Sequence, residues 1–412
     1  MEPVRILIVG GGFGGVRAAL DLSKRIAKNS AAITVLSDKH HFEYTPAHYK
    51  LAVGTSPLET CIPLADIFAG TGVEYVVDEI AGASLAQKAV FGKSGARYQY
   101  DRVIFALGAE TAYFGIPGVA EHAYQIKTVD AALRLKRHLH DLFFSHAGMT
   151  KGQLMAQLQF VVVGGGPAGV ELAGMLRQYA RSLARTHGIP EKLVTVDILQ
   201  SAPRLLPSMN EAVSRLALMR LDELGINIIL SKAVTRQDEH GVHLDDISLN
   251  AKTIVWTAGV KPNHLYGEIG GLSLDTRGRV LVDARMRANG YDDAYVIGDS
   301  ASTPYAGTAQ TAIYDGGYVA RVIAADLRGT PTPEYRPQQT PYVIPIGKHW
   351  AIFTYKNIAL AGRIFWWLRE LIDLRFFLSI LPPGKALTAW RDGARLCESC
   401  PTCMDAMEKT AG

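Results

Sequence analysis

The stretch VVVGGGPAGVELAG at residues 161–174 decides the fold. A run of branched apolar residues, then glycines, then a helix-forming segment predicts a buried strand, a tight turn and a helix. An earlier stretch, ILIVGGGFGGVRAAL at residues 6–20, has the same pattern. Glycine-rich turns between a strand and a helix bind the pyrophosphate of a dinucleotide. The sequence therefore predicts two dinucleotide-binding units in one chain.

Both turns have the spacing G-x-G-x-x-G. It is formed by Gly10, Gly12 and Gly15 in the first turn and by Gly164, Gly166 and Gly169 in the second, and Phe13, Gly14 and Pro167 lie within the turns as further candidate contacts. The first glycine permits the tight turn, the second lets backbone N–H groups approach the phosphates, and the third lets the helix pack closely. A single motif would also fit a plain connection between a strand and a helix. Two motifs, each in the required context, favour binding sites.

Dinucleotide units often carry an acidic residue at the end of the next strand, where it binds a ribose hydroxyl. In the first unit Ser37 stands there, with Asp38 one position later, and in the second unit Gln200 stands there. A carboxylate would repel the 2′-phosphate of NADPH by about 1 kcal/mol in water and about 4 kcal/mol at an effective dielectric of roughly 20. Because Gln200 is neutral, and because Arg204 follows it as a phosphate partner or a turn residue, we expect NADH as the substrate with NADPH tolerated.

Composition limits the class of protein. The 412 residues exceed one compact core, and strands alternating with helices favour parallel, doubly wound sheets. A net charge of +4 does not indicate a nucleic-acid partner. The sequence contains no signal-peptide pattern, no apolar stretch long enough to predict a transmembrane helix, and four cysteines that do not resemble a secreted disulfide framework. We therefore expect a cytoplasmic protein.

Five motifs occur in a fixed order along the chain. They are GGGFGG (10–15), FALGAETAYFGIPG (105–118), GGGPAGVELAG (164–174), VWTAGVKPN (255–263) and VIGDSA (296–301). This order resembles that of flavoproteins with two dinucleotide-binding domains, and among them the type II NADH:quinone oxidoreductases. The similarity extends to about residue 380.

The resemblance implies an α/β fold with two doubly wound, Rossmann-like domains. The NAD(P) domain is inserted in the FAD domain, and a C-terminal α+β segment with an amphipathic helix follows. The implied boundaries are 1–150 and 286–340 for the FAD domain, 151–285 for the NAD(P)H domain and 341–412 for the C-terminal region. The implied reaction passes a hydride from NADH to FAD and then two electrons to a membrane quinone, without proton pumping. The two cofactors must then be held face to face, which explains why one chain needs two units.

The resemblance also assigns roles to single residues. Ala106 and Gly108 match the chain crossover beside FAD, and Gly298 with Asp299 matches the turn whose aspartate hydrogen-bonds the ribityl chain. Gly259 matches a close approach to the nicotinamide side. Asp299 as a helix N-cap remains an alternative.

Glu171 matches a family glutamate that faces the site where nicotinamide and flavin meet. A surface or helix-packing role for Glu171 is equally compatible with the sequence.

The missing cysteines and one further segment indicate the class of electron acceptor. Cys61 has no partner in the first unit for a redox disulfide, and no cysteine lies between Cys61 and Cys397 to match the sulfide:quinone oxidoreductases. In AQTAIYD (309–315), Ala309 and Gln310 match the family's quinone segment, whereas Tyr314 replaces a second glutamine. Gln310 and Tyr314 are therefore candidate quinone contacts, although a helix packed under the flavin would also fit.

The segment IFWWLRELIDLRFFLSIL at 364–381 predicts a helix that ends before Pro382 and Pro383. Its aromatic and basic residues suit an in-plane membrane anchor, which would attach the protein peripherally to the inner face of the cell membrane. A homodimer interface and a helix packed on the core remain alternatives.

Cys397, Cys400 and Cys403 form a C-x-x-C-x-x-C tail. The spacing suits a soft metal, but a closed tetrahedral site needs a fourth ligand, and none is close in the sequence. We therefore predict no metal site, although these three cysteines would be the ligands if there were one, and an oxidisable or disordered tail is the favoured interpretation.

Two other functions remain compatible with the sequence. One is a soluble NAD(P)H-dependent flavin reductase or oxidase with another acceptor. The other is a redox-sensing protein that keeps FAD and NADH but turns over slowly.

Overall fold

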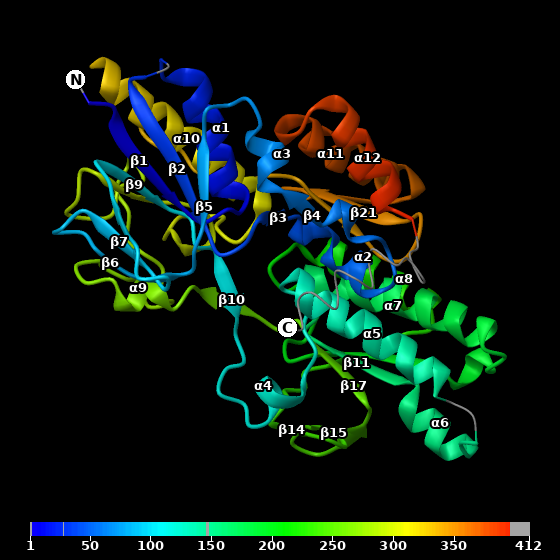
Figure 1. Cartoon of the computed structure of the whole chain (residues 1–412). Coiled ribbons are helices and arrows are strands. Elements are labelled where there is room, and N and C mark those ends of the chain that lie inside the picture. The colour runs from blue at the N-terminus through cyan, green and yellow to red at the C-terminus, as the bar shows by residue number, and fades with distance from the viewer. Residues whose placement is uncertain (1, 28, 146–147, 396–412) are drawn as a thin grey trace. The chain divides into compact units, whose positions relative to one another are not determined.

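The computed structural model describes residues 2–27, 29–145 and 148–395 and divides into two compact units (Figure 1). Unit 1 comprises residues 1–43, 61–110 and 260–340, and unit 2 comprises residues 44–60, 111–259 and 341–412. The chain passes between the units along β10 (Ala109–Thr111) and β18 (Val260–Pro262), which pair with each other. Each unit is therefore assembled from three separate segments of the sequence.

Unit 1 is built on a parallel sheet with the strand order β19-β9-β1-β2-β5. Its strands are β1 (Val4–Val9), β2 (Ala31–Ser37), β5 (Glu74–Val77), β9 (Arg102–Phe105) and β19 (Ala294–Val296). Ile6 to Val9 on the central strand are all buried, as a strand covered on both faces requires. The helices α1 (Phe13–Arg25) and α10 (Ala309–Arg328) pack against each other (Figure 1).

The other elements of unit 1 are short. They are β3 (His41–Glu43), β4 (Cys61–Pro63), α3 (Leu64–Phe68), β6 (Ile80–Ser84), β7 (Ala89–Gly92), β8 (Arg97–Gln99), α9 (Leu265–Glu268) and η4 (Gly298–Ser300).

Unit 2 contains a second parallel sheet with the order β13-β12-β11-β17. Its strands are β11 (Gln159–Val163), β12 (Thr195–Gln200), β13 (Asn227–Leu230) and β17 (Thr253–Trp256), and its long helices are α5 (Val129–Phe144), α7 (Pro167–Thr186) and α8 (Glu211–Glu223). Thr128 is the N-cap of α5, because its hydroxyl accepts a hydrogen bond from the Ala131 N–H. The two parallel sheets confirm the predicted α/β class.

The remaining elements of unit 2 include the C-terminal region. They are η1 (Thr45–Ala47), α2 (His48–Ala52), η2 (Pro57–Glu59), α4 (Val119–His122), α6 (Lys151–Gln157), η3 (Glu191–Leu193), β14 (Arg236–Asp238), β15 (Gly241–His243), β16 (Ser248–Asn250), β20 (Tyr342–Pro345), β21 (Ala351–Tyr355), β22 (Ile358–Gly362), α11 (Arg363–Ile380) and α12 (Pro383–Gly393).

Two short helices were not predicted from the sequence. Helix α6 begins at Lys151 because Thr150 and Gln153 form a capping box. Helix α11 ends before Pro382 as expected, yet Pro383 then starts the unpredicted helix α12. Proline is favourable in the first turn of a helix, so the same residue that stops one helix can begin the next.

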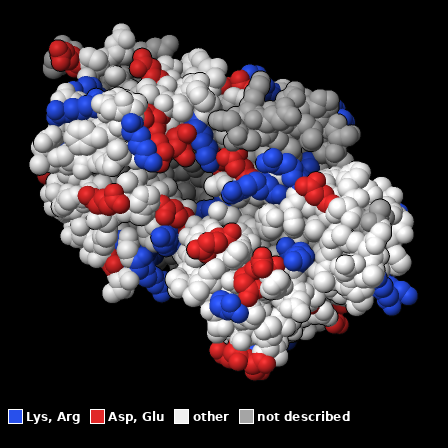
Figure 2. Space-filling view, turned by 60° about the horizontal axis from the view of Figure 1, so that its bottom comes forward, with Lys and Arg blue, Asp and Glu red and all other residues white. Residues whose placement is uncertain are grey.

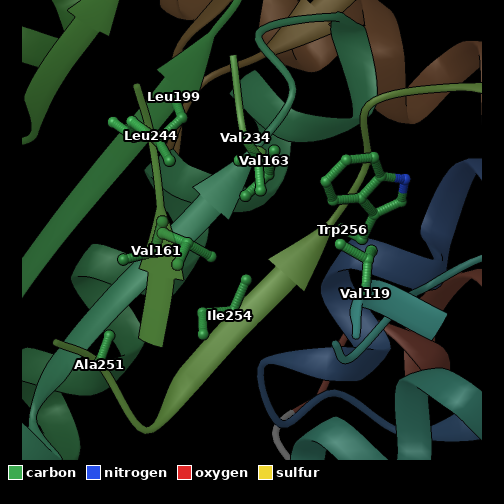
Figure 3. Packing of buried hydrophobic residues seen from close by; sticks show 10 residues of the cluster. Val119, Val161, Val163, Leu199, Val234, Leu244, Ala251, Ile254 and Trp256 are labelled. Atoms are coloured by element: carbon green, nitrogen blue, oxygen red, sulfur yellow. The ribbon is translucent and has the colours of Figure 1, made fainter. Parts of the chain in front are cut away.

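A buried cluster holds the sheet of unit 2 to the segment that follows β10. Figure 3 shows this cluster, in which side chains of β11 and β17 lie with Val119 from α4. Trp256 at the end of β17 is buried, and its indole N–H donates to the Ala112 carbonyl at 2.8 Å. Residues 112–119 are therefore fixed beside the carboxyl end of β17.

Among the described residues, no helix is both long enough and apolar enough to cross a membrane. On the face shown in Figure 2, acidic and basic side chains are interspersed, in agreement with the small net charge.

Candidate functional site

In the first glycine turn, Gly10, Gly12 and Gly15 each lack a side chain for a different structural reason. Gly10 has a φ of +118°, and a Cβ there would lie 2.4 Å from the Ala106 carbonyl oxygen. A Cβ on Gly15 would lie 1.9 Å from the Gly10 oxygen, so the helix can approach the turn only without a side chain. A Cβ on Gly12 would meet nothing within 4 Å. The open space lies at the N-cap of α1, where a helix N-terminus favours a phosphate.

The second turn repeats this geometry in unit 2. Gly164 has a φ of +115°, and a Cβ there would lie 2.6 Å from the Ala258 Cα. A Cβ on Gly169 would lie 1.8 Å from the Gly164 oxygen, whereas one on Gly166, the N-cap of α7, would meet nothing within 4 Å. Both turns thus combine two sterically required glycines with an open one. This is the form of a cradle that a pyrophosphate fills, so the residues present fit a dinucleotide in each unit.

The residues between the glycines of the two motifs also fit. Phe13 is half-buried and packs edge-to-face on Phe42 at a centroid distance of 4.9 Å. Gly14 allows α1 to approach Ile297, because a Cβ would lie 2.9 Å from its Cδ1. Pro167 occupies the first turn of α7, where its missing N–H costs nothing.

The side chains at the ends of the second strands lie under the glycine turns. Ser37 is buried, and a Cβ on Gly11 would lie 2.6 Å from its Oγ. Gln200 accepts a hydrogen bond from the Gly165 N–H on its Oε1 at 2.9 Å. Asp38 is exposed, one residue beyond β2. Gln200 therefore supports its turn directly, a role that the sequence did not predict.

Of the two roles considered for Arg204, phosphate partner and turn residue, the structure shows the turn residue. Its guanidinium donates to the Ser214 hydroxyl at 2.7 Å and to the Pro207 carbonyl at 2.7 Å. These bonds hold the loop after β12. The phosphate contact that the sequence also allowed stays a prediction.

A buried carboxylate organises the VIGD turn of unit 1. Asp315 on α10 accepts hydrogen bonds from the Gly298 N–H at 3.0 Å and from the Tyr335 hydroxyl at 2.7 Å. Burial raises the pKa of Asp315 to about 6, against the opposing effect of these hydrogen bonds. The Ser300 hydroxyl donates to the Gly108 carbonyl, so the predicted crossover and the VIGD turn are joined.

Asp299 lies on this turn and is half-buried. The capping alternative does not apply, because the N-cap of α10 is Thr308. The sequence identified the VIGD turn but missed Asp315 as its anchor; the signal was an acid in an otherwise apolar helix pattern.

The predicted quinone segment forms the first turns of α10. Ala309 and Gln310 begin the helix and are half-buried. The Tyr314 hydroxyl donates to the Arg336 carbonyl at 3.1 Å, so it is engaged with the segment that follows α10. The roles of Gln310 and Tyr314 toward a quinone stay predictions.

Glu171 lies in the second turn of α7 in a partly buried position. Burial raises the pKa of its carboxyl to about 8, and the negative charge of Asp373 adds to this, while Arg369 and Lys50 oppose it. Glu171 therefore holds a proton at neutral pH, which a plain surface glutamate would not do.

A buried charge cluster in unit 2 was missed by the sequence analysis. The Lys50 ammonium on α2 lies 3.1 Å from a Glu59 oxygen, 3.3 Å from Glu370 and 3.8 Å from Asp373. On α11, Arg369 pairs with Asp373 at 3.0 Å. All three carboxylates are buried, so their charges are balanced chiefly by these two cations.

The cluster determines which way α11 faces. Its charged residues Glu370 and Asp373 are buried, whereas Ile364, Trp367 and Leu371 are exposed by 73%, 58% and 57%. The sequence predicted an amphipathic helix, and the structure shows that its two acidic residues point inward, whereas the basic residues Arg363 and Arg375 are exposed. Because Glu370 and Asp373 find Lys50 of α2 as their partner, Ile364, Trp367 and Leu371 are left on the outer side of the helix.

Among the described residues no group of side chains could hold a metal ion. Cys397, Cys400 and Cys403 lie outside the described residues.

Comparison with known proteins places these features in context. Residues 4–316 match the pyridine nucleotide-disulphide oxidoreductase family. A type II NADH:quinone oxidoreductase of Staphylococcus aureus (strain MSSA476) is 30% identical over 395 residues, which cover 93% of this chain and 97% of the relative.

Two solved structures share the fold. NDH2 from Plasmodium falciparum in complex with NADH superposes with a TM-score of 0.84 at 18% identity, covering 95% of this chain and 97% of that one. The sulfide:quinone oxidoreductase of Aquifex aeolicus superposes with a TM-score of 0.78 at 21% identity, covering 97% and 98%.

Proposed function

Because the chain belongs to the type II NADH:quinone oxidoreductase family, we propose that it oxidises NADH and reduces a quinone to the quinol, with FAD as its resident cofactor. Per turnover, NADH, one proton and a quinone give NAD⁺ and the quinol. The observation that carries the proposal is the pair of glycine turns with matching geometry, in a chain 30% identical to a type II enzyme over nearly its whole length. The family and α/β fold expected from the sequence are confirmed.

Unit 1 would hold FAD. Gly10, Gly12 and Gly15 would receive its pyrophosphate at the N-terminus of α1, and Asp299 would accept hydrogen bonds from its ribityl hydroxyls. Bound FAD supplies the two-electron chemistry that links the nicotinamide to the quinone. Asp315 would keep the VIGD turn in place, because it holds the Gly298 N–H.

Unit 2 would hold NADH on the second turn. Gly166 leaves room for the pyrophosphate, and the neutral Gln200 leaves the adenosine ribose site without a carboxylate. No negative charge from that position would repel a 2′-phosphate, so NADPH would be tolerated.

The reaction consumes one proton, and Glu171 would hold one at its carboxyl group. We expect the turnover number of the parent enzyme to fall above pH 8, where this proton is lost, and a Glu171→Gln variant to lack that fall.

The free energy of unfolding should depend on the titration of the same carboxyl group. The raised pKa means that ionisation between pH 4.5 and 8 costs stability, so the Gln variant should gain stability relative to the parent as pH rises through this range. Steady-state pH profiles and thermal melts measure both effects, with the exposed Glu121→Gln as control.

A stopped-flow acceptor panel tests the function. NADH should bleach the flavin absorbance rapidly, and a soluble quinone analogue should restore it much faster than oxygen does. Restoration by oxygen alone would instead identify an oxidase. Slow bleaching with a persistent charge-transfer band would identify a redox sensor.

The outward apolar face of α11 would attach the protein to a membrane. Trp367 and Leu371 are each more than half exposed, and withdrawing such side chains from water yields about 1.5–3 kcal/mol each. A Trp367→Glu/Leu371→Glu variant should therefore bind phosphatidylglycerol-containing vesicles about 100-fold more weakly in flotation. The control is Leu218→Glu/Met219→Glu on α8, which changes two exposed apolar residues of the same unit. Equal loss in both variants, or in neither, would contradict attachment through α11.

A further inference from the structure

Phe114 is an aromatic residue in an unusual position. Its side chain is 67% exposed, and its backbone has a φ of +54°, in the left-handed region that bulky residues rarely adopt. The segment around it is well fixed: Ala112 accepts from the Trp256 indole, and Val119 lies in the core cluster beside Trp256 (Figure 3). A strained backbone thus presents an apolar ring to solvent from a rigid base.

The ring lies close to the second glycine turn. A Cβ on Gly259 would be 2.6 Å from the Phe114 Cζ, so the ring rests directly on that glycine. The neighbouring Ala258 is the residue that Gly164 approaches so closely that a Cβ would be 2.6 Å away. Phe114 therefore contacts Gly259, and the adjacent Ala258 contacts Gly164 of the turn that would hold the NADH pyrophosphate.

The strand order tells which half of the dinucleotide would reach this ring. In a unit of this kind the pyrophosphate lies at the end of the central strand and the adenosine ribose at the end of the strand that follows it. Here these are β11 and β12, and β12 ends at Gln200. β17 lies on the opposite side of β11, and Gly259 follows it. The nicotinamide half therefore extends toward Phe114.

We propose that the Phe114 ring packs against the nicotinamide half of bound NADH and that Gly259 holds the ring in that position. The proposal rests on the proposed function, since it requires NADH as the ligand of unit 2. It also accounts for two features together: an exposed phenylalanine on a strained backbone, and a glycine at 259 where a side chain would displace the ring.

The test compares two ligands on the FAD-loaded enzyme. Phe114→Ala should raise the Kd of NADH about tenfold, as expected for the loss of one aromatic stacking contact. ADP-ribose lacks the nicotinamide ring, so its inhibition constant should stay within about twofold. Phe114→Tyr should retain the parent value for NADH. Gly259→Ala should weaken NADH as Phe114→Ala does, and should have no further effect in the Phe114→Ala background.

The matched control is Phe144→Ala, because Phe144 is 69% exposed in the same unit but packs on His187. An unchanged Kd for NADH in Phe114→Ala would overturn the proposal, and so would an equal loss of NADH and ADP-ribose. Failure of the proposed function would differ: the parent would bind NADH without reducing quinones, and the two-ligand comparison could still be made.

Discussion

A Gly166→Val variant should purify with FAD bound and yet require at least about 100-fold more NADH for half-maximal flavin reduction. A Cβ at Gly166 would meet no protein atom within 4 Å, so the fold of unit 2 should tolerate a side chain there. The same space is where a pyrophosphate would approach the backbone N–H groups at the start of α7. Losing about two hydrogen bonds to a charged group, at about 1.5–3 kcal/mol each, gives a loss of that size. Anaerobic stopped-flow titration with NADH measures it, together with the flavin content.

Two other glycines make this experiment specific. Gly152 on α6 is equally open, so Gly152→Val should leave the NADH requirement unchanged. Gly169→Ala should lower the melting temperature, because its Cβ would lie 1.8 Å from the Gly164 oxygen. If Gly166→Val bound NADH normally, the second turn would not be the NADH site.

The second large effect concerns folding. Lys50→Met should lower the free energy of unfolding by about 3–5 kcal/mol, the range found when one partner of a buried ion pair is removed. The ammonium lies within 4 Å of three buried carboxylates, and without it Asp373 would keep its ion pair with Arg369 while Glu59 and Glu370 would lose the cation that contacts them in the described part of the chain. Urea unfolding of the FAD-loaded protein measures the change. The exposed Lys252→Met should stay within about 0.5 kcal/mol of the parent.

The pH dependence of this deficit distinguishes charge from packing. Burial already raises the pKa of Glu59 in the intact cluster, while Lys50 lowers it. Removing Lys50 raises the folded-state pKa of Glu59 further, so the variant should regain stability as pH falls and Glu59 takes up a proton. Glu59→Gln should cost much less than Lys50→Met, because Lys50 keeps Glu370 and Asp373. A deficit independent of pH would indicate lost packing instead of unbalanced charge.

A feature could be predicted from the sequence when the residues that determine it lie close together in the chain. The glycine turns were predictable because each requirement involves residues close in the chain, such as Gly15 against Gly10. The N-cap at Thr128 was predictable for the same reason. Gln200 and Arg204 were identified as candidates, but their observed hydrogen bonds to Gly165 and Ser214 depend on how the loops close.

The buried charge cluster was not predictable in this way. Lys50 and Glu370 are far apart in the sequence and meet only after α2 and α11 have packed. In 364–381, apolar and charged residues define two sides of a helix. The pattern alone does not say which of the two sides packs against the rest of the protein. The ordinary expectation, charges outward, was reversed for Glu370 and Asp373 because Lys50 supplies a buried partner. Asp315 shows the same dependence, since its partners Gly298 and Tyr335 lie on either side of α10 in the chain.

The inward carboxylates of α11 bear on how the C-terminal region of the chain could be altered. Cutting the chain before residue 363 would uncover Lys50 and Glu59 and leave them without Glu370 and Asp373. A shortened protein should therefore aggregate or unfold. Replacing outward residues such as Ile364 and Leu378 with hydrophilic ones, while keeping the helix, is the route compatible with this architecture.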